Sequence, residues 1–313
     1  EVTHVPPGRV TDRSIGANDP LCRREGLPLD TCPMCRLFAM NAGLNEVHVT
    51  YWLLDAPDSI LAESHRNPDG TGIGWFDAHG PHVAKQPKSA FDDPLFSQEA
   101  AAIDACTLVT HVRAATAGHD ALQNTHPFEM DGLIVAHNGG FGDLDAVDAE
   151  LGDWAQKVRG DTDSERYAAL IAKYAHDRGD VGAGFAEAAN WLADNVPMYS
   201  LNAVVVSKGN LWALRYPDQR ALHVAKRRLD PLSGGVWSGA SDTASHTVVS
   251  DHPTDVVLVA SERIDGSEDW RMLDPGELIH VGPDLQVGST IAVDHAPARL
   301  HLLDETDPNI DDV

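Results

Sequence analysis

The order of the apolar segments along the chain is the feature that most constrains its fold. Short apolar or β-branched runs, typical of strands, occupy residues 35–137. Three segments with helical spacing follow between residues 144 and 194, and strand-like runs return from residue 201 to residue 281. Strands and helices do not alternate, and no internal repeat or Pro/Gly-rich linker divides the chain. The pattern therefore predicts mixed sheets with helices packed outside them.

The individual elements follow from local patterns. Strands are predicted at residues 35–40, 69–77, 82–85, 107–112, 133–137, 201–206, 211–215, 221–225, 256–261 and 277–281. Helices are predicted at residues 144–151, 164–177 and 181–194, with shorter ones near residue 57 and within 92–104. Residues 230–253 are rich in Gly, Ser, Thr and Asp and are predicted to form a surface loop. The segment Asp161-Thr162-Asp163-Ser164 supplies capping chemistry to the second main helix.

Composition narrows the classes of partner. The net charge of -25 argues against nucleic acid or an anionic membrane as the main partner. No apolar run approaches the ~18 residues of a membrane span, and residues 1–34 lack the apolar core of a secretory signal. The four cysteines in 313 residues are no disulfide framework. These features predict a cytoplasmic protein that does not bind membranes.

Residues 1–34 contain scattered prolines and no helical or strand periodicity, whereas an apolar run begins at Cys35. We expect residues 1–34 to be a disordered leader, a propeptide or a stretch upstream of a misassigned start. Residues 35–285 are expected to form the working domain, and residues 286–313 a C-terminal tail that is acidic from Asp304. If Met34 is the initiator, its removal leaves Cys35 with a free α-amine. A thiol with a pKa of about 8.5 beside an amine with a pKa of about 8 forms a nucleophile and base within one residue.

A second interpretation of Cys35 rests on the sequence Cys32-Pro33-Met34-Cys35. This C-x-x-C spacing suits a redox pair or half of a zinc site, with Cys22 as a third ligand. No second C-x-x-C completes such a site, and Cys32 is absent if Met34 initiates the chain. Cys106 adjoins the strand predicted at residues 107–112 and is expected in the core.

Three further segments carry polar groups suited to amide chemistry. Arg113 ends a predicted strand, where a guanidinium can bind a carboxylate through two parallel hydrogen bonds. Asn138 and Gly139 can supply a side-chain amide and a backbone N–H to an oxyanion, although an Asn-Gly turn after a strand needs no function. Asp163 stands at a helix start, where an acid commonly serves as a cap.

Taken in order, the motifs resemble those of the class II glutamine amidotransferases of the N-terminal nucleophile hydrolase superfamily, in particular the short stand-alone type. The likeness extends over residues 35–281 and rests on CRLFAM, DGTGIGWFD, HVRAATAG, NTHPF, AHNGGFGDL, GDTDSE and VLVASERID. It implies an α+β fold, a four-layer αββα sandwich of two antiparallel sheets covered by helices.

The resemblance also implies roles for individual residues. Cys35 would be the nucleophile, with Asn138 and Gly139 stabilising the oxyanion. Arg113 would bind the substrate α-carboxylate and Asp163 its α-ammonium. Thr116 would line the same pocket, and His126 is equally well explained as a substrate contact or as a structural loop residue. His111 is expected to support its strand.

The implied reaction is hydrolysis of a γ-glutamyl amide through a thioester on Cys35, without a metal ion or an organic cofactor. The partner is a small γ-glutamyl molecule. The length of the chain leaves no room for a fused synthase domain, so either a separate enzyme accepts the ammonia or the compound is simply hydrolysed. Relatives in ergothioneine biosynthesis and glutathione degradation do the latter. The leaving group and the oligomeric state stay open. If residues 1–34 are retained, the alternative is a catalytically silent module that binds glutamate-like ligands.

Overall fold

The computed structural model describes residues 35–56, 58–65, 67–113, 121–229, 253–264 and 267–300. Several predictions fall outside these residues: the leader at 1–34 with Cys22 and Cys32, Thr116, almost all of the loop at 230–253, and the acidic end of the chain from Asp304.

The first sheet has the strand order β13-β11-β12-β1-β6-β3-β4, and all its neighbouring strands are antiparallel. Its strands are β1 (Arg36–Asn41), β3 (Gly70–Asp77), β4 (Gly80–Gln86), β6 (Thr107–Arg113), β11 (His223–Leu229), β12 (Thr254–Ala260) and β13 (Arg271–Met272). The nucleophile segment therefore leads into β1, in the centre of this sheet. A separate two-stranded ribbon pairs β2 (Val47–His48) with β5 (Asp104–Ala105).

The second sheet has the order β15-β14-β10-β9-β8-β7, and these neighbours are antiparallel as well. Its strands are β7 (Phe128–Met130), β8 (Leu133–Phe141), β9 (Pro197–Ser207), β10 (Asn210–Arg215), β14 (Glu277–Val281) and β15 (Val287–Ile291). A short strand, β16 (Arg299–Leu300), adds a parallel pair to β9. The segment expected as a tail from residue 286 thus contains β15 and β16.

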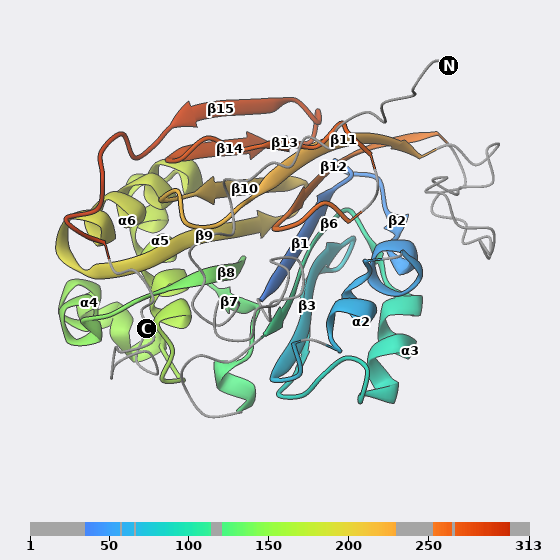
Figure 1. Ribbon diagram of the computed structural model, residues 1–313, viewed down its shortest axis with the longest axis horizontal. Helices are drawn as coiled ribbons and strands as arrows, with labels where there is room; N and C mark the ends of the chain where they lie inside the picture. Colours follow the sequence, from blue (N-terminus) through green and yellow to red (C-terminus); the bar gives the residue numbers. More distant parts are fainter. Residues whose placement is uncertain are drawn as a thin grey trace, which may run out of the picture.

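Helices cover the outer face of each sheet (Figure 1). The second sheet carries α4 (Leu144–Leu151), α5 (Asp163–Arg178) and α6 (Val181–Asn195), and the first carries η2 (Tyr51–Asp55), α2 (Ile60–Glu63) and α3 (Pro94–Ala102). Two short 3-10 helices, η3 (Leu122–Asn124) and η4 (Gly152–Lys157), lie in connections. Three separate apolar cores fill the spaces between the four layers. The predicted αββα sandwich is confirmed.

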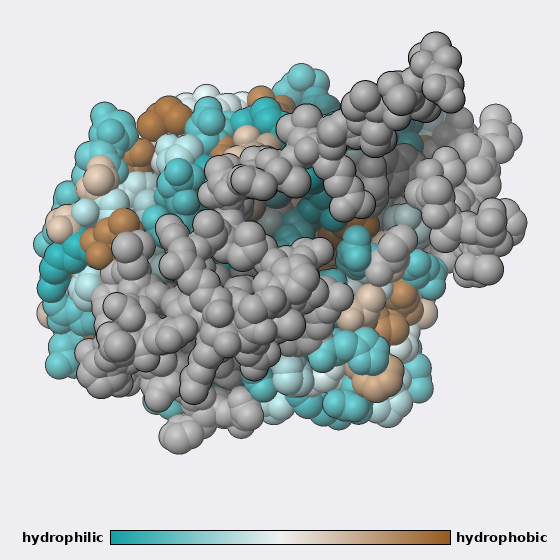
Figure 2. Space-filling model, in the orientation of Figure 1, coloured by the Kyte–Doolittle hydropathy of each residue, from teal (hydrophilic) through white to brown (hydrophobic). Residues whose placement is uncertain are grey.

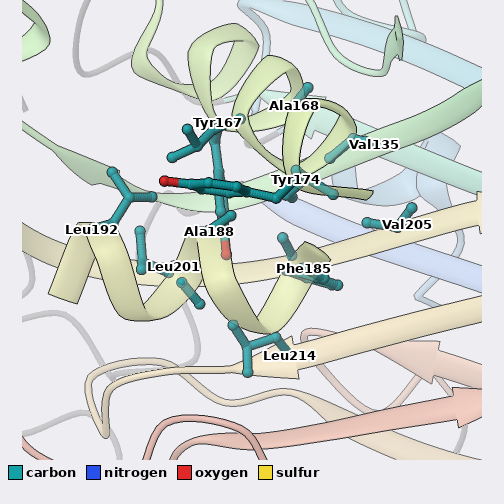
Figure 3. Packing of buried hydrophobic residues seen from close by; sticks show 14 of the residues in the cluster. Val135, Tyr167, Ala168, Tyr174, Phe185, Ala188, Leu192, Leu201, Val205 and Leu214 are labelled. Atoms are coloured by element: carbon teal, nitrogen blue, oxygen red, sulfur yellow. The ribbon is translucent and has the colours of Figure 1, made fainter. Parts of the chain in front are cut away.

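The apolar face predicted for the long central helix packs against the second sheet. Tyr167, Leu170 and Ile171 of α5 are completely buried. Figure 3 shows Tyr167 and Tyr174 of α5 beside Phe185 of α6, with side chains of β8, β9 and β10 around them. This spacing of three and four residues places the side chains on one side of the helix. The packing anchors the N-terminus of α5 against β8.

Two predicted boundaries are wrong: the end of β8 and the start of the first short helix. Strand β8 does not end at His137 in a turn, but continues through Asn138 and Gly139 to Phe141. It continues because β9 starts at Pro197, earlier than predicted, and supplies main-chain partners along the whole length. The first short helix starts at Ile60 with Ser59 as its N-cap, rather than near residue 57.

The glycines of β3 do not pack against the nucleophile strand β1. Strand β6 lies between β1 and β3. Gly72 instead faces the loop that precedes β7, where a Cβ atom on residue 72 would lie 2.1 Å from the carbonyl oxygen of His126. The absence of a side chain at residue 72 therefore lets this loop enter the space between the sheets.

We expect the substitution Gly72→Ala to destabilise the protein by about 3 kcal/mol, because a backbone oxygen cannot move aside as a flexible side chain can. Urea denaturation followed by tryptophan fluorescence would measure the change. Gly282→Ala is the matched control, since a Cβ atom there meets nothing closer than 3.5 Å. An equal midpoint for the two variants would contradict the assigned role of Gly72.

No helix among the described residues is long and apolar enough to cross a bilayer. On the face shown in Figure 2, brown hydrophobic residues are scattered among teal hydrophilic ones and do not form one patch. This distribution agrees with the strongly acidic composition.

Candidate active site

Cys35 lies immediately before β1 and is partly buried. Strand β1 is held on both sides, by β12 and by β6. Close to Cys35, the main chain of Leu37 is fixed by Ser261: its N–H donates to Ser261 Oγ at 3.1 Å, and its carbonyl accepts from Ser261 N–H at 2.9 Å. The candidate thiol therefore directly precedes a strand that is hydrogen-bonded on both sides.

Arg113 ends β6, next to Cys35. In the pairing of β1 with β6, Arg36 lies opposite Val112, so the register continued by one residue sets Cys35 opposite Arg113. Side chains alternate along a strand, and Arg113 shares its face with Val109, which belongs to the core between the sheets. Arg113 is only 6% exposed. A guanidinium at this position is suited to binding a carboxylate beside the thiol.

Asn138 reaches the nucleophile segment from the opposite sheet. Its side-chain Nδ2 donates to the carbonyl oxygen of Cys35 at 3.0 Å. This bond uses one of the two N–H groups of the amide and holds the amide beside Cys35. At Gly139, a Cβ atom would lie 2.0 Å from the carbonyl oxygen of Ser200, so no larger residue fits without moving β9. Both oxyanion candidates therefore have defined positions on a strand.

Asp163 is the first residue of α5, and the cap of this helix lies within the predicted segment 161–164, although neither Asp161 nor Asp163 supplies it. The cap is Thr162, whose Oγ1 accepts from the N–H of Glu165 at 3.3 Å. Asp163 Oδ2 instead accepts from the N–H of Phe141 at 3.2 Å. A bulge between Gly140 and Phe141 breaks the pairing with β9 and turns this N–H towards α5. Strand β8 thus positions both Asn138 and Asp163.

The sequence analysis assigned no role to His137 and Ser164, which connect these two parts of the site. His137 Nδ1 lies 2.9 Å from Ser164 Oγ, and its Nε2 lies 3.0 Å from the carbonyl oxygen of Ser200. The ring packs edge-on against Tyr167. Burial lowers the pKa of His137, against the opposing effects of Asp163 and the Ser200 carbonyl. The alternation of side chains along β8 was the available signal, since it sends His137 and Asn138 to opposite faces.

His126 lies inside the protein and packs against His111, with ring centroids 4.2 Å apart and ring planes tilted by 31°. Among the described residues, neither ring has a hydrogen-bond partner for its nitrogen atoms. Burial first, and then the nearby His137 and Arg113, lower the pKa of His111 to about 3. Burial and the neighbouring His111 likewise hold the pKa of His126 far below its ordinary value. Both imidazoles are therefore neutral at neutral pH.

Lys85 of β4 holds the loop that carries His126. Its Nζ donates to the carbonyl oxygens of Thr125, at 2.7 Å, and Pro127, at 3.2 Å. Burial lowers the pKa of Lys85 to about 8, opposed by the attraction of Glu165. The sequence analysis did not identify this lysine, because its partners are backbone atoms about 40 residues away along the chain.

The structure thus brings most of the predicted residues to one end of the two sheets. Cys35, Arg113, Asn138 and Gly139 gather there, with Asp163 attached through Phe141. Thr116 lies outside the described residues. Within the described part of the chain, no three His, Cys, Asp or Glu residues are arranged to hold a metal ion. The gathered groups are a thiol, a guanidinium, a side-chain amide and a carboxylate.

The family model of the class II glutamine amidotransferases matches residues 34–301. The chain therefore belongs to the class II glutamine amidotransferases, enzymes that act on amide C–N bonds.

Relatives of known sequence agree with this assignment. The glutamine amidotransferase homologue YafJ of Escherichia coli K12 is 29% identical over 223 residues, which are 67% of this chain and 83% of YafJ. The γ-glutamyl-hercynylcysteine sulfoxide hydrolase of Mycobacterium tuberculosis is 30% identical over 104 residues, 30% of this chain and 45% of that protein. Both the stand-alone type and a γ-glutamyl hydrolase are thus among the relatives.

Solved structures share the fold. The glutamine phosphoribosylpyrophosphate amidotransferase of Bacillus subtilis aligns with a TM-score of 0.59 and 17% identity, over 84% of this chain but only 50% of its own. A class II glutamine aminotransferase domain protein from Silicibacter pomeroyi aligns with a TM-score of 0.54 and 19% identity, over 82% and 98% of the two chains. At these identities the likeness establishes the N-terminal nucleophile hydrolase fold.

Proposed function

We propose that this protein hydrolyses a γ-glutamyl amide through a thioester on Cys35. The observation that carries the proposal is the hydrogen bond from the Asn138 amide to the carbonyl of Cys35, which joins a strand of the second sheet to the nucleophile segment of the first. An amide donor held beside a thiol is the arrangement needed to stabilise an oxyanion on the attacked carbonyl.

Recognition of the substrate rests on Arg113 and Asp163. A γ-glutamyl compound carries an α-carboxylate and an α-ammonium on the same carbon. Arg113, buried at the end of β6, supplies the cation for the carboxylate, and Asp163, with its side chain 18% exposed, supplies the anion for the ammonium. These two charges select an α-amino acid head group and leave the γ-amide to reach Cys35.

The α-amine of Cys35, when it is free, acts first as the general base and then as the general acid of the reaction. The amine accepts the thiol proton, and the sulfur attacks the γ-carbonyl carbon to form a C–S bond. Asn138 and the Gly139 N–H stabilise the oxyanion. When the oxyanion collapses, the C–N bond breaks and the leaving amine takes the proton from the α-ammonium of Cys35. Water then attacks the thioester, which releases glutamate and restores the thiol.

The leaving group defines the physiological role. Two relatives point to different roles: the mycobacterial protein is a hydrolase of a γ-glutamyl compound, whereas the Bacillus protein is an amidotransferase. We propose a small γ-glutamyl molecule as the partner, with release of its amine either to water or to a separate ammonia-accepting enzyme.

The free α-amine is the testable core of this mechanism. We expect the chain beginning at Cys35 to hydrolyse γ-glutamyl-p-nitroanilide, and the same chain with residues 1–34 retained to be slower by about 10²-fold or more, because the general base is lost. Initial rates and the intact mass of the acid-quenched protein, which records the glutamyl adduct, would measure both effects. Equal rates would contradict the free-amine mechanism. Glutamate binding without turnover by either chain would favour the silent binding module.

A further inference from the structure

The side chains of Asp163, Ser164 and His137 share a single hydroxyl proton. Ser164 Oγ lies 3.3 Å from Asp163 Oδ1 and 2.9 Å from His137 Nδ1. The other oxygen of the carboxylate, Oδ2, is bound by the N–H of Phe141 and lies 3.9 Å from His137 Nδ1. Because a serine has one O–H, it can donate to the carboxylate or to the imidazole, but not to both.

The other nitrogen of His137 decides which groups compete. Nε2 lies 3.0 Å from the carbonyl oxygen of Ser200, which can only accept a hydrogen bond. Nε2 therefore carries the proton, and in the neutral ring Nδ1 is an acceptor. The imidazole and the carboxylate of Asp163 are thus two acceptors for the Ser164 hydroxyl.

The surroundings of His137 keep its imidazole neutral at neutral pH, so that Nδ1 remains an acceptor for the Ser164 hydroxyl. Among the described residues, the titratable neighbours of His137 are Asp163 and Tyr167 of α5, the neutral His111 of β6 and the neutral His126 of the loop before β7. The side chain of His137 is fully buried, and burial lowers its pKa. Tyr167, labelled in Figure 3, packs edge-on against the ring and fixes its plane.

We propose that Ser164 and His137 are positioning residues for Asp163, and that the Ser164 hydroxyl donates to His137 alone when a substrate α-ammonium reaches the carboxylate. Without substrate, the hydroxyl is shared between Nδ1 of His137, at 2.9 Å, and Oδ1 of Asp163, at 3.3 Å. With substrate, the ammonium donates to the carboxylate, and the hydroxyl donates to the buried Nδ1 only. No proton leaves any group. Leaving a buried acceptor such as Nδ1 without a donor costs free energy. When an ammonium binds the carboxylate, the Ser164 hydroxyl still pairs with Nδ1, so no acceptor is left unpaired. A ligand without an ammonium does not supply this second donor.

This inference rests on the proposed function for the identity of the head group, and it concerns selectivity. L-Glutamate and glutarate both carry two carboxylates, but only glutamate has the α-ammonium. The exchange at Ser164 therefore affects glutamate and not glutarate. A general disturbance of the site would weaken both ligands alike and leave the ratio of their dissociation constants unchanged. A change in this ratio therefore reports on the Ser164 hydroxyl alone.

The experiment measures the binding of glutamate and glutarate by calorimetry at pH 7.5 to the wild type and to the variants Ser164→Ala and Ser164→Thr. We expect the wild type to bind glutamate about tenfold or more tightly than glutarate. Ser164→Ala should weaken glutamate about three- to tenfold and leave glutarate within about twofold. Ser164→Thr retains the hydroxyl and should restore most of the preference.

Ser89→Ala is the matched control, because Ser89 is also a buried serine, whose Oγ donates to the carbonyl of Ser64 and not to Asp163 or His137. It should not change the ratio. An unchanged ratio in Ser164→Ala, or equal weakening of both ligands, would overturn the positioning role. Turnover of γ-glutamyl-p-nitroanilide by the wild type is measured separately, so that an inactive protein that still prefers glutamate would reject the hydrolase and leave the role of Ser164 standing.

Discussion

Replacing Cys35 by serine is expected to reduce the hydrolysis of a γ-glutamyl amide by at least about 10³-fold. An alkoxide is far more basic than a thiolate, and an α-amine with a pKa of about 8 cannot generate it in useful amounts at neutral pH. The hydroxyl is also a poorer nucleophile without a stronger base beside it. Initial rates with γ-glutamyl-p-nitroanilide measure the effect, and the intact mass of the quenched protein should lose the glutamyl adduct.

Cys106 provides the control for this substitution. It is buried, and its Sγ lies 3.3 Å from the carbonyl oxygen of Phe76 as a donor. We expect Cys106→Ala to lower the stability of the protein by about 1 kcal/mol and to leave the rate of the folded protein unchanged. An active Cys35→Ser variant, or a Cys106→Ala variant that folds but does not turn over, would contradict the assignment of the nucleophile.

Asn138→Ala is expected to lower kcat by about 10²- to 10³-fold, the loss typical of removing one oxyanion donor. KM should change much less, because the amide donor acts on charge that develops only in the transition state. The substitution also removes the donor to the Cys35 carbonyl, which holds the two sheets together at this point. Asn138→Asp keeps the shape but places a negative charge beside the oxyanion, and we expect it to be at least as inactive. Steady-state kinetics with γ-glutamyl-p-nitroanilide measures kcat and KM.

A buried asparagine elsewhere separates catalysis from stability. Asn41 lies at the far end of β1, and its Nδ2 donates to the carbonyl oxygens of Gly209 and Val281. Asn41→Ala should therefore destabilise the fold, by about 1–3 kcal/mol, while kcat of the folded protein stays near that of the wild type. If Asn138→Ala instead follows Asn41→Ala, with lower stability and unchanged kcat, the oxyanion role of Asn138 is wrong.

The sequence predicted the regular elements well where the period of apolar residues was strong. Helix α4 was predicted with its observed limits, and α5 and α6 to within one residue at each end. The short strands β7, β13 and β16 were not predicted. They contain two or three residues each and exist only because a neighbouring strand supplies hydrogen-bond partners. A run of two residues has no period to read.

The candidate site divides in the same way. The motif order singled out Cys35, Arg113, Asn138 and Asp163, because each stands at the end of a recognisable element. Ser164 and His137 lie directly beside two of these residues in the sequence but received no role. Their side chains meet across the space between β8 and α5, which no local pattern specifies. The roles of Cys35 and Asn138 in catalysis, and of Arg113 and Asp163 in substrate binding, are predictions.

What the sequence by itself determined was most of the longer helices and strands, and a motif order whose likeness to the class II glutamine amidotransferases implies the αββα layers. These follow from periodicity and motif order, which are local properties of the chain. What only the tertiary structure decided was the continuation of β8 through Asn138, the bulge that turns the Phe141 N–H towards Asp163, and the entry of the His126 loop over Gly72. Each of these depends on a hydrogen-bond partner or a steric limit supplied by a segment remote in sequence. The sequence contains the reactive groups but does not give the distances between them. Only the tertiary structure places the amide of Asn138 within hydrogen-bond distance of the carbonyl of Cys35.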